Sequence, residues 1–266
     1  MTPRAFALLA MMALPVTAGA QWTVQPGGWF NSHSFNSGRF PDRNSGNTRD
    51  ALEKEDWGTY FIYGLREGLS VGFGQGYAHL RQPSGDSTLT TTGFGATGLF
   101  VMKRIAQGRA GVLSIQPRVD LPLLYDTDDR PVLGPVRAEG EIRLLYGTGY
   151  GIGGRRGFIS ASAGLAAWRE GADEVRYDLT VGLDAASRVL IMGQAFNVAA
   201  FSDGELAYSA TKLGAAAMFR VNRRVGLLVG YYGGVSGRNT ARERTLSFAI
   251  WLSHEPATPV VPATIR

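Results

Sequence analysis

The chain has 266 residues, with 27 Lys and Arg against 22 Asp and Glu and a formal net charge of +5. It contains no cysteine, so disulfide bonds and thiol chemistry are excluded. The basic residues are scattered along the chain, which argues against nucleic-acid binding. Apolar residues are plentiful, and 36 residues are glycine, but the apolar residues do not gather into helical stripes.

The first twenty residues have the pattern of an export signal. Arg4 precedes an apolar run over residues 5–16, and small residues follow at 18–20. A positive start, a short apolar run and an Ala-x-Ala-like site predict a cleaved signal peptide over residues 1–20. The apolar run is too short for a membrane anchor and contains Pro15. No later run of 18 apolar residues predicts a membrane-spanning helix.

Alternation of apolar with polar or small residues recurs along the rest of the chain. It is clearest near the end, where Leu246, Phe248, Ile250 and Leu252 share one face. The predicted strands cover residues 21–35, 57–64, 69–78, 88–102, 112–121, 136–144, 158–168, 175–184, 189–201, 206–219, 225–232 and 244–253. Residues 36–56 are predicted to form a long polar loop and residues 147–157 a glycine-rich turn.

Two of these strands show how the faces are assigned. In residues 69–78 the large side chains are expected to face lipid, and the small ones to face a narrow interior. In residues 88–102 the lipid face is predicted to carry Phe94, Ala96, Phe100 and Met102. Pro117 removes a ladder hydrogen bond from its strand, so a bulge or weakened pairing is expected there.

Charged residues recur on the opposite faces at a spacing of two. The predicted lumen-lining residues are Arg118, Asp120, Arg137, Glu139, Glu141, Arg143, Arg176, Asp178 and Asp184. Each Lys or Arg facing lipid at the bilayer midplane would cost about 2 to 4 kcal/mol, so these side chains are expected to face inward. Opposite charges on neighbouring strands predict cross-strand ion pairs. These pairs either fill the lumen or form a charged constriction that selects small polar solutes.

The predicted fold is all-β: a transmembrane antiparallel β-barrel of about twelve strands in the outer membrane, over residues 21–253. An even number of strands is expected of bacterial barrels. Leu246, Phe248, Ile250 and Leu252 are predicted to be the membrane-facing residues of the closing strand. Residues 254–266 contain three prolines and are predicted to be a disordered tail.

The three histidines, His33, His79 and His254, are separated in the sequence, so no metal site is predicted. His79 lies near the end of its strand and is expected at the same end of the barrel as an acidic loop that contains Asp126, Asp128 and Asp129. A histidine beside such carboxylates can activate water. A barrel hydrolase that uses His79 and these aspartates is therefore the alternative to a non-enzymatic barrel.

Two stretches resemble known barrels. Residues 62–72, Ile-Tyr-Gly-Leu-Arg-Glu-Gly-Leu-Ser-Val-Gly, are similar to a Tyr-Gly-Leu hairpin of proteobacterial outer-membrane barrels. Residues 237–240, Gly-Arg-Asn-Thr, together with the final Leu-Ser-Phe-Ala-Ile-Trp-Leu strand, resemble the XagA-like group of these barrels. The resemblance implies a barrel associated with surface polysaccharide, and it supplies no catalytic residues.

The predicted function is a narrow channel for small polar solutes, or a structural or accessory component at the cell surface. No cofactor is expected. The expected partners are outer-membrane lipid and the barrel assembly machinery, with a surface polysaccharide or a small solute as further candidates. Nucleic acid is not expected as a partner.

Overall fold

A computed structural model describes residues 23–41, 51–168, 173–201 and 207–256. These residues form twelve strands: β1 (Trp29–Phe40), β2 (Leu52–Arg66), β3 (Leu69–Ser84), β4 (Ser87–Gly108), β5 (Gly111–Leu121), β6 (Glu139–Ile152), β7 (Arg155–Trp168), β8 (Asp173–Ala186), β9 (Val189–Phe201), β10 (Ser209–Arg220), β11 (Val225–Arg238) and β12 (Arg244–His254). The predicted signal peptide and most of the predicted tail lie outside the described residues.

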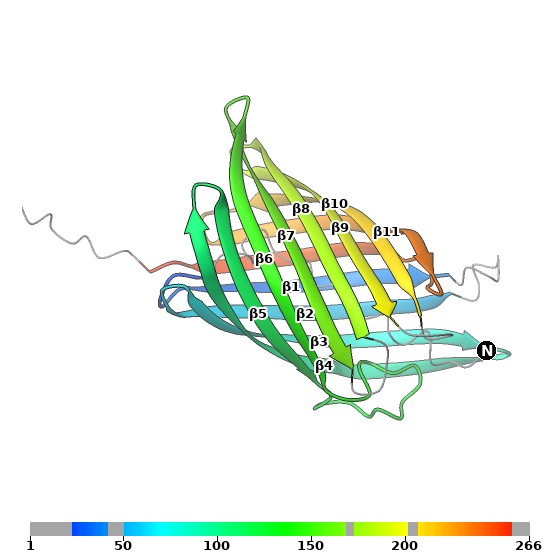
Figure 1. Ribbon diagram of the computed structural model, residues 1–266. Coiled ribbons are helices and arrows are strands. Elements are labelled where there is room, and N and C mark those ends of the chain that lie inside the picture. Colours follow the sequence, from blue (N-terminus) through cyan, green and yellow to red (C-terminus); the bar gives the residue numbers. More distant parts are fainter. Residues whose placement is uncertain (1–22, 42–50, 169–172, 202–206, 257–266) are drawn as a thin grey trace, which may run out of the picture.

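The strands form one closed barrel (Figure 1). Each strand pairs antiparallel with its neighbours, and β1 pairs with β12 from Trp29–His254 to Arg39–Arg244. Closure leaves no sheet edge with unpaired backbone groups, which is what a hydrocarbon environment requires. Within the described ranges, no helix is long and apolar enough to cross a membrane. The prediction of an all-β, twelve-stranded antiparallel barrel is confirmed.

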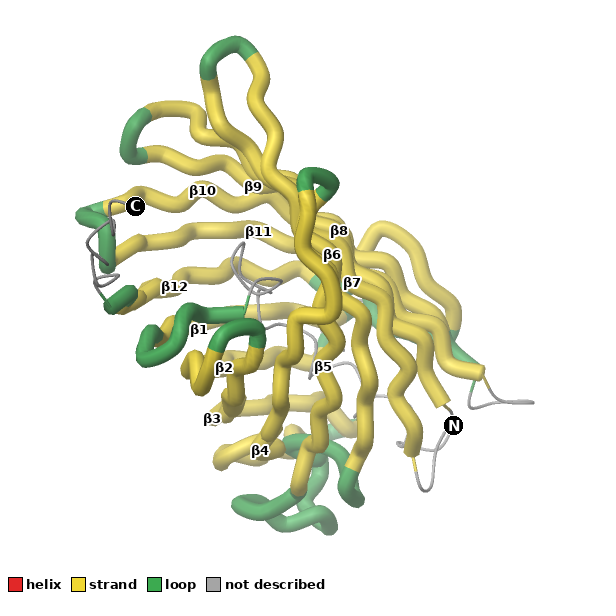
Figure 2. The backbone as a smooth tube through the Cα atoms, turned by 60° about the vertical axis from the view of Figure 1, so that its left-hand side comes forward, coloured by secondary structure: helices red, strands yellow, loops and turns green. Residues whose placement is uncertain are grey.

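The two ends of the barrel differ. The turns after β2, β4, β6, β8 and β10 are short, and we call their end the turn end. The longest described connection, residues 122–138, lies at the other end, which we call the loop end (Figure 2). Short turns face the periplasm in bacterial barrels, so the loop end is the side expected to face outward.

Burial alternates along the strands because one face meets the interior and the other meets the surroundings. In β12, Leu246, Phe248 and Ile250 are 43–46% exposed, whereas Thr245 and Ser247 are buried. Leu252, near the end of the strand, is half-buried. On the outer wall of β1 to β4, aromatic rings continue from strand to strand, as in Phe35–Trp57, Trp57–Tyr77 and Tyr77–Phe94. Apolar outer walls with aromatic belts are typical of membrane barrels.

The outer wall gives a first test of membrane insertion. Ile250→Arg is expected to destabilise the barrel in lipid vesicles by about 2 to 4 kcal/mol, because Ile250 lies on the apolar wall. The matched control is Ile152→Arg. Ile152 is 61% exposed at the tip of the β6–β7 hairpin, beyond the last β5–β6 pair at Val112–Gly147. Urea titration followed by tryptophan fluorescence compares the two, and equal effects would contradict a lipid-facing Ile250.

Several predicted boundaries are wrong because polar sequence was taken for loop or turn. β1 begins at Trp29 and continues to Phe40, and β2 begins at Leu52, so strands include much of the predicted loop over residues 36–56. Lys54 and Asp56 are buried on the inner face of β2, where they form an ion pair of 3.0 Å. Similarly, the turn between β6 and β7 is only residues 153–154, where both glycines have positive φ.

The face predicted for β4 is wrong beyond its middle. The β3–β4 register shifts by one residue between Gln75–Thr97 and Tyr77–Phe94, so β4 contains a bulge. An extra residue reverses the inside–outside alternation. Phe94 is exposed as predicted, but Phe100 and Met102 are buried in the interior.

The bulge is held by side chains on the outer wall. Gln75 Nε2 donates hydrogen bonds of 3.0 Å to the carbonyl oxygens of Gly76 and Gly95, which flank the irregularity. Thr97 Oγ1 donates to Gln75 Oε1 at 2.6 Å. These bonds satisfy polar groups that would otherwise face hydrocarbon unpaired.

The weakened strand pairing predicted at Pro117 is present in the structure. The β4–β5 register continues unchanged from Phe100–Arg118 to Lys103–Ile115, but the pairs Val101–Pro117 and Met102–Gln116 between them are missing. Toward β6, Pro117 keeps its place opposite Ile142. The missing proline N–H therefore weakens the pairing on one side without producing a bulge at this point.

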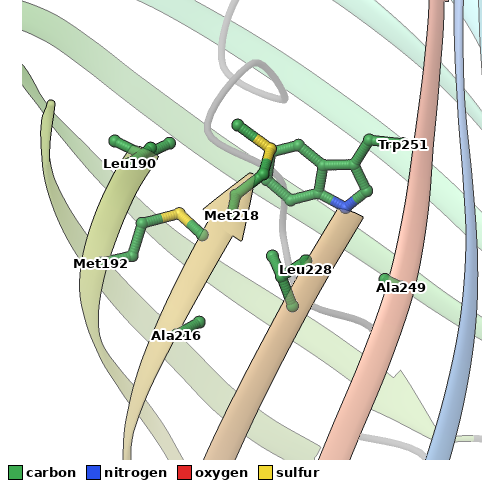
Figure 3. Packing of buried hydrophobic residues seen from close by; sticks show 7 residues of the cluster. All are labelled: Leu190, Met192, Ala216, Met218, Leu228, Ala249 and Trp251. Atoms are coloured by element: carbon green, nitrogen blue, oxygen red, sulfur yellow. The ribbon is translucent and has the colours of Figure 1, made fainter. Parts of the chain in front are cut away.

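Apolar side chains fill the part of the interior nearer the turn end. One cluster comprises Leu190, Met192, Ala216, Met218, Leu228, Ala249 and Trp251 (Figure 3). A second comprises Ile62, Phe100, Met102 and Leu145. The ring of Phe30 packs against both clusters and lies edge-on to Trp251, with 5.8 Å between ring centroids. The interior is therefore closely filled at this level.

Candidate functional site in the barrel interior

Buried charges gather on the inner face of β5, β6 and β8, toward the loop end. We define the ion-pair cluster as eight residues: Arg118, Asp120, Glu139, Glu141, Arg143, Glu174, Arg176 and Asp178. β6 begins at Glu139 and β8 at Asp173, so Glu139 and Glu174 lie at the loop end of their strands. The three guanidinium groups of the cluster face five carboxylates.

Arg176 is the centre of the cluster. Its Nη2 lies 2.6 Å from Glu139 Oε1 and 2.6 Å from Glu174 Oε2, and its Nη1 lies 3.3 Å from Glu141 Oε2. Glu139 and Glu174 are each 1% exposed. A single guanidinium thus contacts three deeply buried carboxylates on two different strands.

The other two arginines extend the network along the same wall. Arg143 contacts Glu141 at 2.6 Å and Asp178 at 2.9 Å, so Glu141 links Arg143 to Arg176. Arg118 contacts Asp120 through two hydrogen bonds of 2.6 and 2.8 Å. Two-point contacts of this kind fix both side chains in one geometry.

Inward-facing glycines leave room for these large side chains. A Cβ on Gly98 would lie 2.2 Å from Arg118 Nη2 and 2.6 Å from Asp120 Oδ1. A Cβ on Gly164 would lie 2.6 Å from Arg143 Cγ and 2.9 Å from Glu141 Oε1. The positions of the arginines on β5 and β6 therefore depend on glycines in β4 and β7.

Two of the predicted lumen-lining residues, Arg137 and Asp184, do not belong to the ion-pair cluster. Arg137 precedes β6 and is exposed in the connection from β5, so its predicted place in the interior is wrong. The alternation that includes Glu139, Glu141 and Arg143 does not extend back to Arg137, because the chain leaves the sheet there. Asp184 faces inward near the turn end and pairs with Arg220 at 2.6 Å, away from the ion-pair cluster.

Sequence reasoning missed several buried charges. Glu174 lies just before the predicted strand 175–184, Lys54 and Asp56 lie in the predicted loop over residues 36–56, and no role was predicted for Lys212 and Glu243. Lys212 Nζ lies 3.0 Å from Glu243 Oε2, and it also lies over the rings of Phe196 and Tyr232 at 5.4 and 5.8 Å from their centroids. Opposite charges two residues apart would have identified the pairs Lys54–Asp56 and Glu174–Arg176.

The connection between β5 and β6 folds back into the loop end of the barrel, and we call residues 122–138 the infolded loop. Its residues Val132 and Leu133 are only 4% and 6% exposed. Leu133 belongs to a cluster with the inward-facing Phe40, Leu52 and Leu80. Residues 131–135 are thus buried inside the mouth rather than extended into solvent.

Tyr125 holds the infolded loop together. Its hydroxyl donates a hydrogen bond of 2.5 Å to the Pro135 carbonyl oxygen. Burial raises the pKa of the Tyr125 hydroxyl, and the nearby carboxylates of Asp120 and Glu139 raise it further. Tyr125 therefore lies near Asp120 and Glu139 of the ion-pair cluster.

The described residues before β1 fold into the opposite end. The Val24 N–H donates to Ser70 Oγ at 3.0 Å, and Val24 packs against the cluster that contains Ile62 and Phe100. A Cβ on the inward-facing Gly64 would lie 2.1 Å from the Gln25 carbonyl oxygen. The segment therefore fits against the inner wall where β2 lacks a side chain.

The closing seam of the barrel carries small polar residues on its inner face. Ser34 of β1 and Ser247 of β12 are buried, and their hydroxyls have no hydrogen-bond partner within the described part of the chain. The same holds for the Trp251 indole N–H. Buried polar groups are nearly always hydrogen-bonded, to protein or to water. These three groups therefore have hydrogen-bonding capacity for water or a solute.

His79 lies on the outer wall, not in the interior. It alternates with the buried Ala78 and Leu80, and its Nδ1 is 2.6 Å from Thr92 Oγ1 on β4. Asp126, Asp128 and Asp129 lie in the infolded loop, and Asp126 Oδ1 accepts the Asp128 N–H. Across the described ranges, no group of three or more His, Cys, Asp and Glu residues is arranged to hold a metal ion.

No family model matches the chain, and no curated protein matches its sequence. Among solved structures, the COG4313 outer membrane channel from Pseudomonas putida F1 superposes with a TM-score of 0.68 at 14% identity, covering 89% of this chain and 98% of that one. The NanC porin gives 0.53 at 8% identity, covering 83% and 98%. The beta domain of the Bordetella autotransporter BrkA gives 0.52 at 16% identity, covering 87% and 100%.

Identities this low show a shared fold. Together with the closed sheet and the apolar outer wall, they define the class: the chain is an outer-membrane β-barrel. The resemblance of residues 237–240 and the final strand to XagA-like barrels is not supported by a family model.

Proposed function

We propose that this barrel is a narrow outer-membrane channel for small polar solutes. The ion-pair cluster is the observation that carries the proposal. Replacing a buried ion pair with packed hydrophobic residues is often neutral or stabilising, so stability alone gives little reason to keep eight charged groups inside a barrel. A charged constriction in a pore gives such a reason.

Three further features support a narrow path for solutes through the barrel interior. The unpartnered groups of Ser34, Ser247 and Trp251 line the inner seam, where water or a polar solute can bind them. The infolded loop packs into the loop end of the barrel, where Leu133 contacts Phe40, Leu52 and Leu80. The apolar clusters near the turn end form a constriction of the kind that excludes water until it widens.

Single-channel recording in a planar bilayer tests the proposal. The purified barrel is expected to give small discrete current steps whose amplitude changes on Arg143→Ala, because this change removes a cation from the inner wall. Ile250→Ala, on the outer wall, is the control and is expected to leave the steps unchanged. Silence of a correctly folded wild-type barrel would instead favour a filled, structural barrel.

The alternatives have less support. The outward position of His79 and its hydrogen bond to Thr92 do not favour a hydrolase that uses His79 with the loop aspartates. An accessory role with surface polysaccharide rests on the short sequence resemblance and stays a prediction.

A further inference from the structure

The ion-pair cluster contains more negative than positive charge. Arg118, Arg143 and Arg176 supply three positive groups. Five carboxylates face them: Asp120, Glu139, Glu141, Glu174 and Asp178. With all eight groups ionised, three minus five leaves a net charge of −2.

The excess is concentrated around Arg176. Glu139 and Glu174 both lie 2.6 Å from the same nitrogen, Nη2, so one N–H₂ group is shared between two carboxylates. The contact with Glu139 lacks hydrogen-bond geometry, and neither oxygen of Glu139 has a hydrogen-bond partner within the described ranges. Glu139 therefore retains unused acceptor capacity, although it is almost fully buried.

Buried negative charge of this kind is costly unless it is compensated. Compensation comes either from protonation of a carboxylate or from a bound cation. Glu139 is the first residue of β6 and Glu174 the second of β8, so both lie at the loop end of the inner wall. Tyr125, in the infolded loop, lies near Glu139, and its ring adds an aromatic surface of the type that attracts organic cations.

We propose that Glu139 and Glu174, beside Arg176, form a binding site for a small organic cation with an ammonium or guanidinium group. The inference rests on the proposed channel function and assigns its solute class. The cation occupies the side of Glu139 that Arg176 leaves unbonded, and its positive charge reduces the net charge of the cluster. The same excess of carboxylates makes the channel prefer cations to anions.

The test compares wild type with Glu139→Gln/Glu174→Gln, which keeps side-chain size and removes both charges. In a KCl gradient the wild-type channel is expected to pass K⁺ more readily than Cl⁻, and the sign of its reversal potential shows this preference. The K⁺/Cl⁻ permeability ratio is expected to fall about threefold or more in the double variant. Methylammonium, added on the loop-end side, is expected to reduce the wild-type current at concentrations that leave the variant unaffected. Glu55→Gln, on the exposed face of β2, is the matched control and should behave as wild type.

A second measurement does not depend on conduction. Methylammonium is expected to raise the thermal unfolding midpoint of the wild-type barrel in detergent, relative to KCl at equal ionic strength, and to have no such effect on the double variant. Clear current steps with no cation preference, or with a preference unchanged in the variant, would overturn the site and leave the channel standing. A silent barrel that methylammonium still stabilises would overturn the channel and leave the site standing.

Discussion

Opening the infolded loop is expected to increase the single-channel conductance several-fold. Replacing residues 131–135 with a Gly-Ser sequence removes the Leu133 side chain from its cluster with Phe40, Leu52 and Leu80, and it loosens the backbone whose carbonyl oxygen at residue 135 accepts the Tyr125 hydroxyl. The loop then lacks the apolar contacts that hold it inside the mouth, and the constriction above the ion-pair cluster widens. Current amplitude in a planar bilayer measures the change.

The same loop provides the control. Leu123 and Leu124 are 62% and 54% exposed, so Leu123→Ser/Leu124→Ser removes apolar side chains of the loop without disturbing its buried part. This variant is expected to conduct like wild type. An unchanged conductance after replacement of residues 131–135 would show that the restriction lies elsewhere, and the apolar clusters near the turn end would be the next candidates.

Among the substitutions considered, replacing Arg176 is expected to lower the free energy of unfolding of the barrel the most. Arg176→Met leaves Glu139, Glu141 and Glu174 without their shared guanidinium, and breaking a buried ion pair by removing one partner costs about 3 to 5 kcal/mol. Urea unfolding of the barrel in lipid vesicles, followed by tryptophan fluorescence, measures the difference.

Arg39→Met is the matched control. Arg39 pairs with Glu53 at 2.6 Å, but the two side chains are 70% and 39% exposed, and a surface pair contributes about 1 kcal/mol or less. Equal losses for the two variants would contradict the burial of the Arg176 contacts. Adding Glu139→Gln/Glu174→Gln to Arg176→Met is expected to restore part of the stability, because the excess charge is removed together with its partner.

The fold could be predicted from the sequence because two different environments act on alternate residues. Leu246, Phe248 and Ile250 alternate with Thr245, Ser247 and Ala249, and only a wall between an apolar exterior and a narrow interior explains such a pattern over a whole chain. The bounds of β9, residues 189–201, were predicted as the structure has them, and those of β5 and β12 differ by one residue.

The incorrect predictions of strand faces and strand bounds also have local causes. The bulge opposite Gly76 adds one residue to β4, and alternation alone cannot reveal an inserted residue, so Phe100 and Met102 were placed on the wrong side. Charged strand ends such as residues 52–56 have the composition of a loop, although their charges are paired inside. The return of Leu133 into the mouth depends on contacts with β1, β2 and β3, which are distant in sequence.

The candidate site was partly predictable for the same reasons. A spacing of two identified seven members of the ion-pair cluster, because residues on one face of a strand recur at that period. It did not identify Glu174, which stands at a strand end, and it wrongly extended the series to Arg137. Which arginine meets which carboxylate depends on strand register, which the sequence alone does not specify.

Four of the interior ion pairs join residues two apart on one strand: Lys54–Asp56, Arg118–Asp120, Glu141–Arg143 and Glu174–Arg176. Such partners are close as soon as the strand itself is extended, before any neighbouring strand arrives. A strand that enters the bilayer during assembly therefore carries these eight charges as local neutral pairs, which lowers the cost of desolvating them. Separating the members of one pair, by exchanging the residue order on a strand, would slow membrane insertion even where the finished barrel regains every contact.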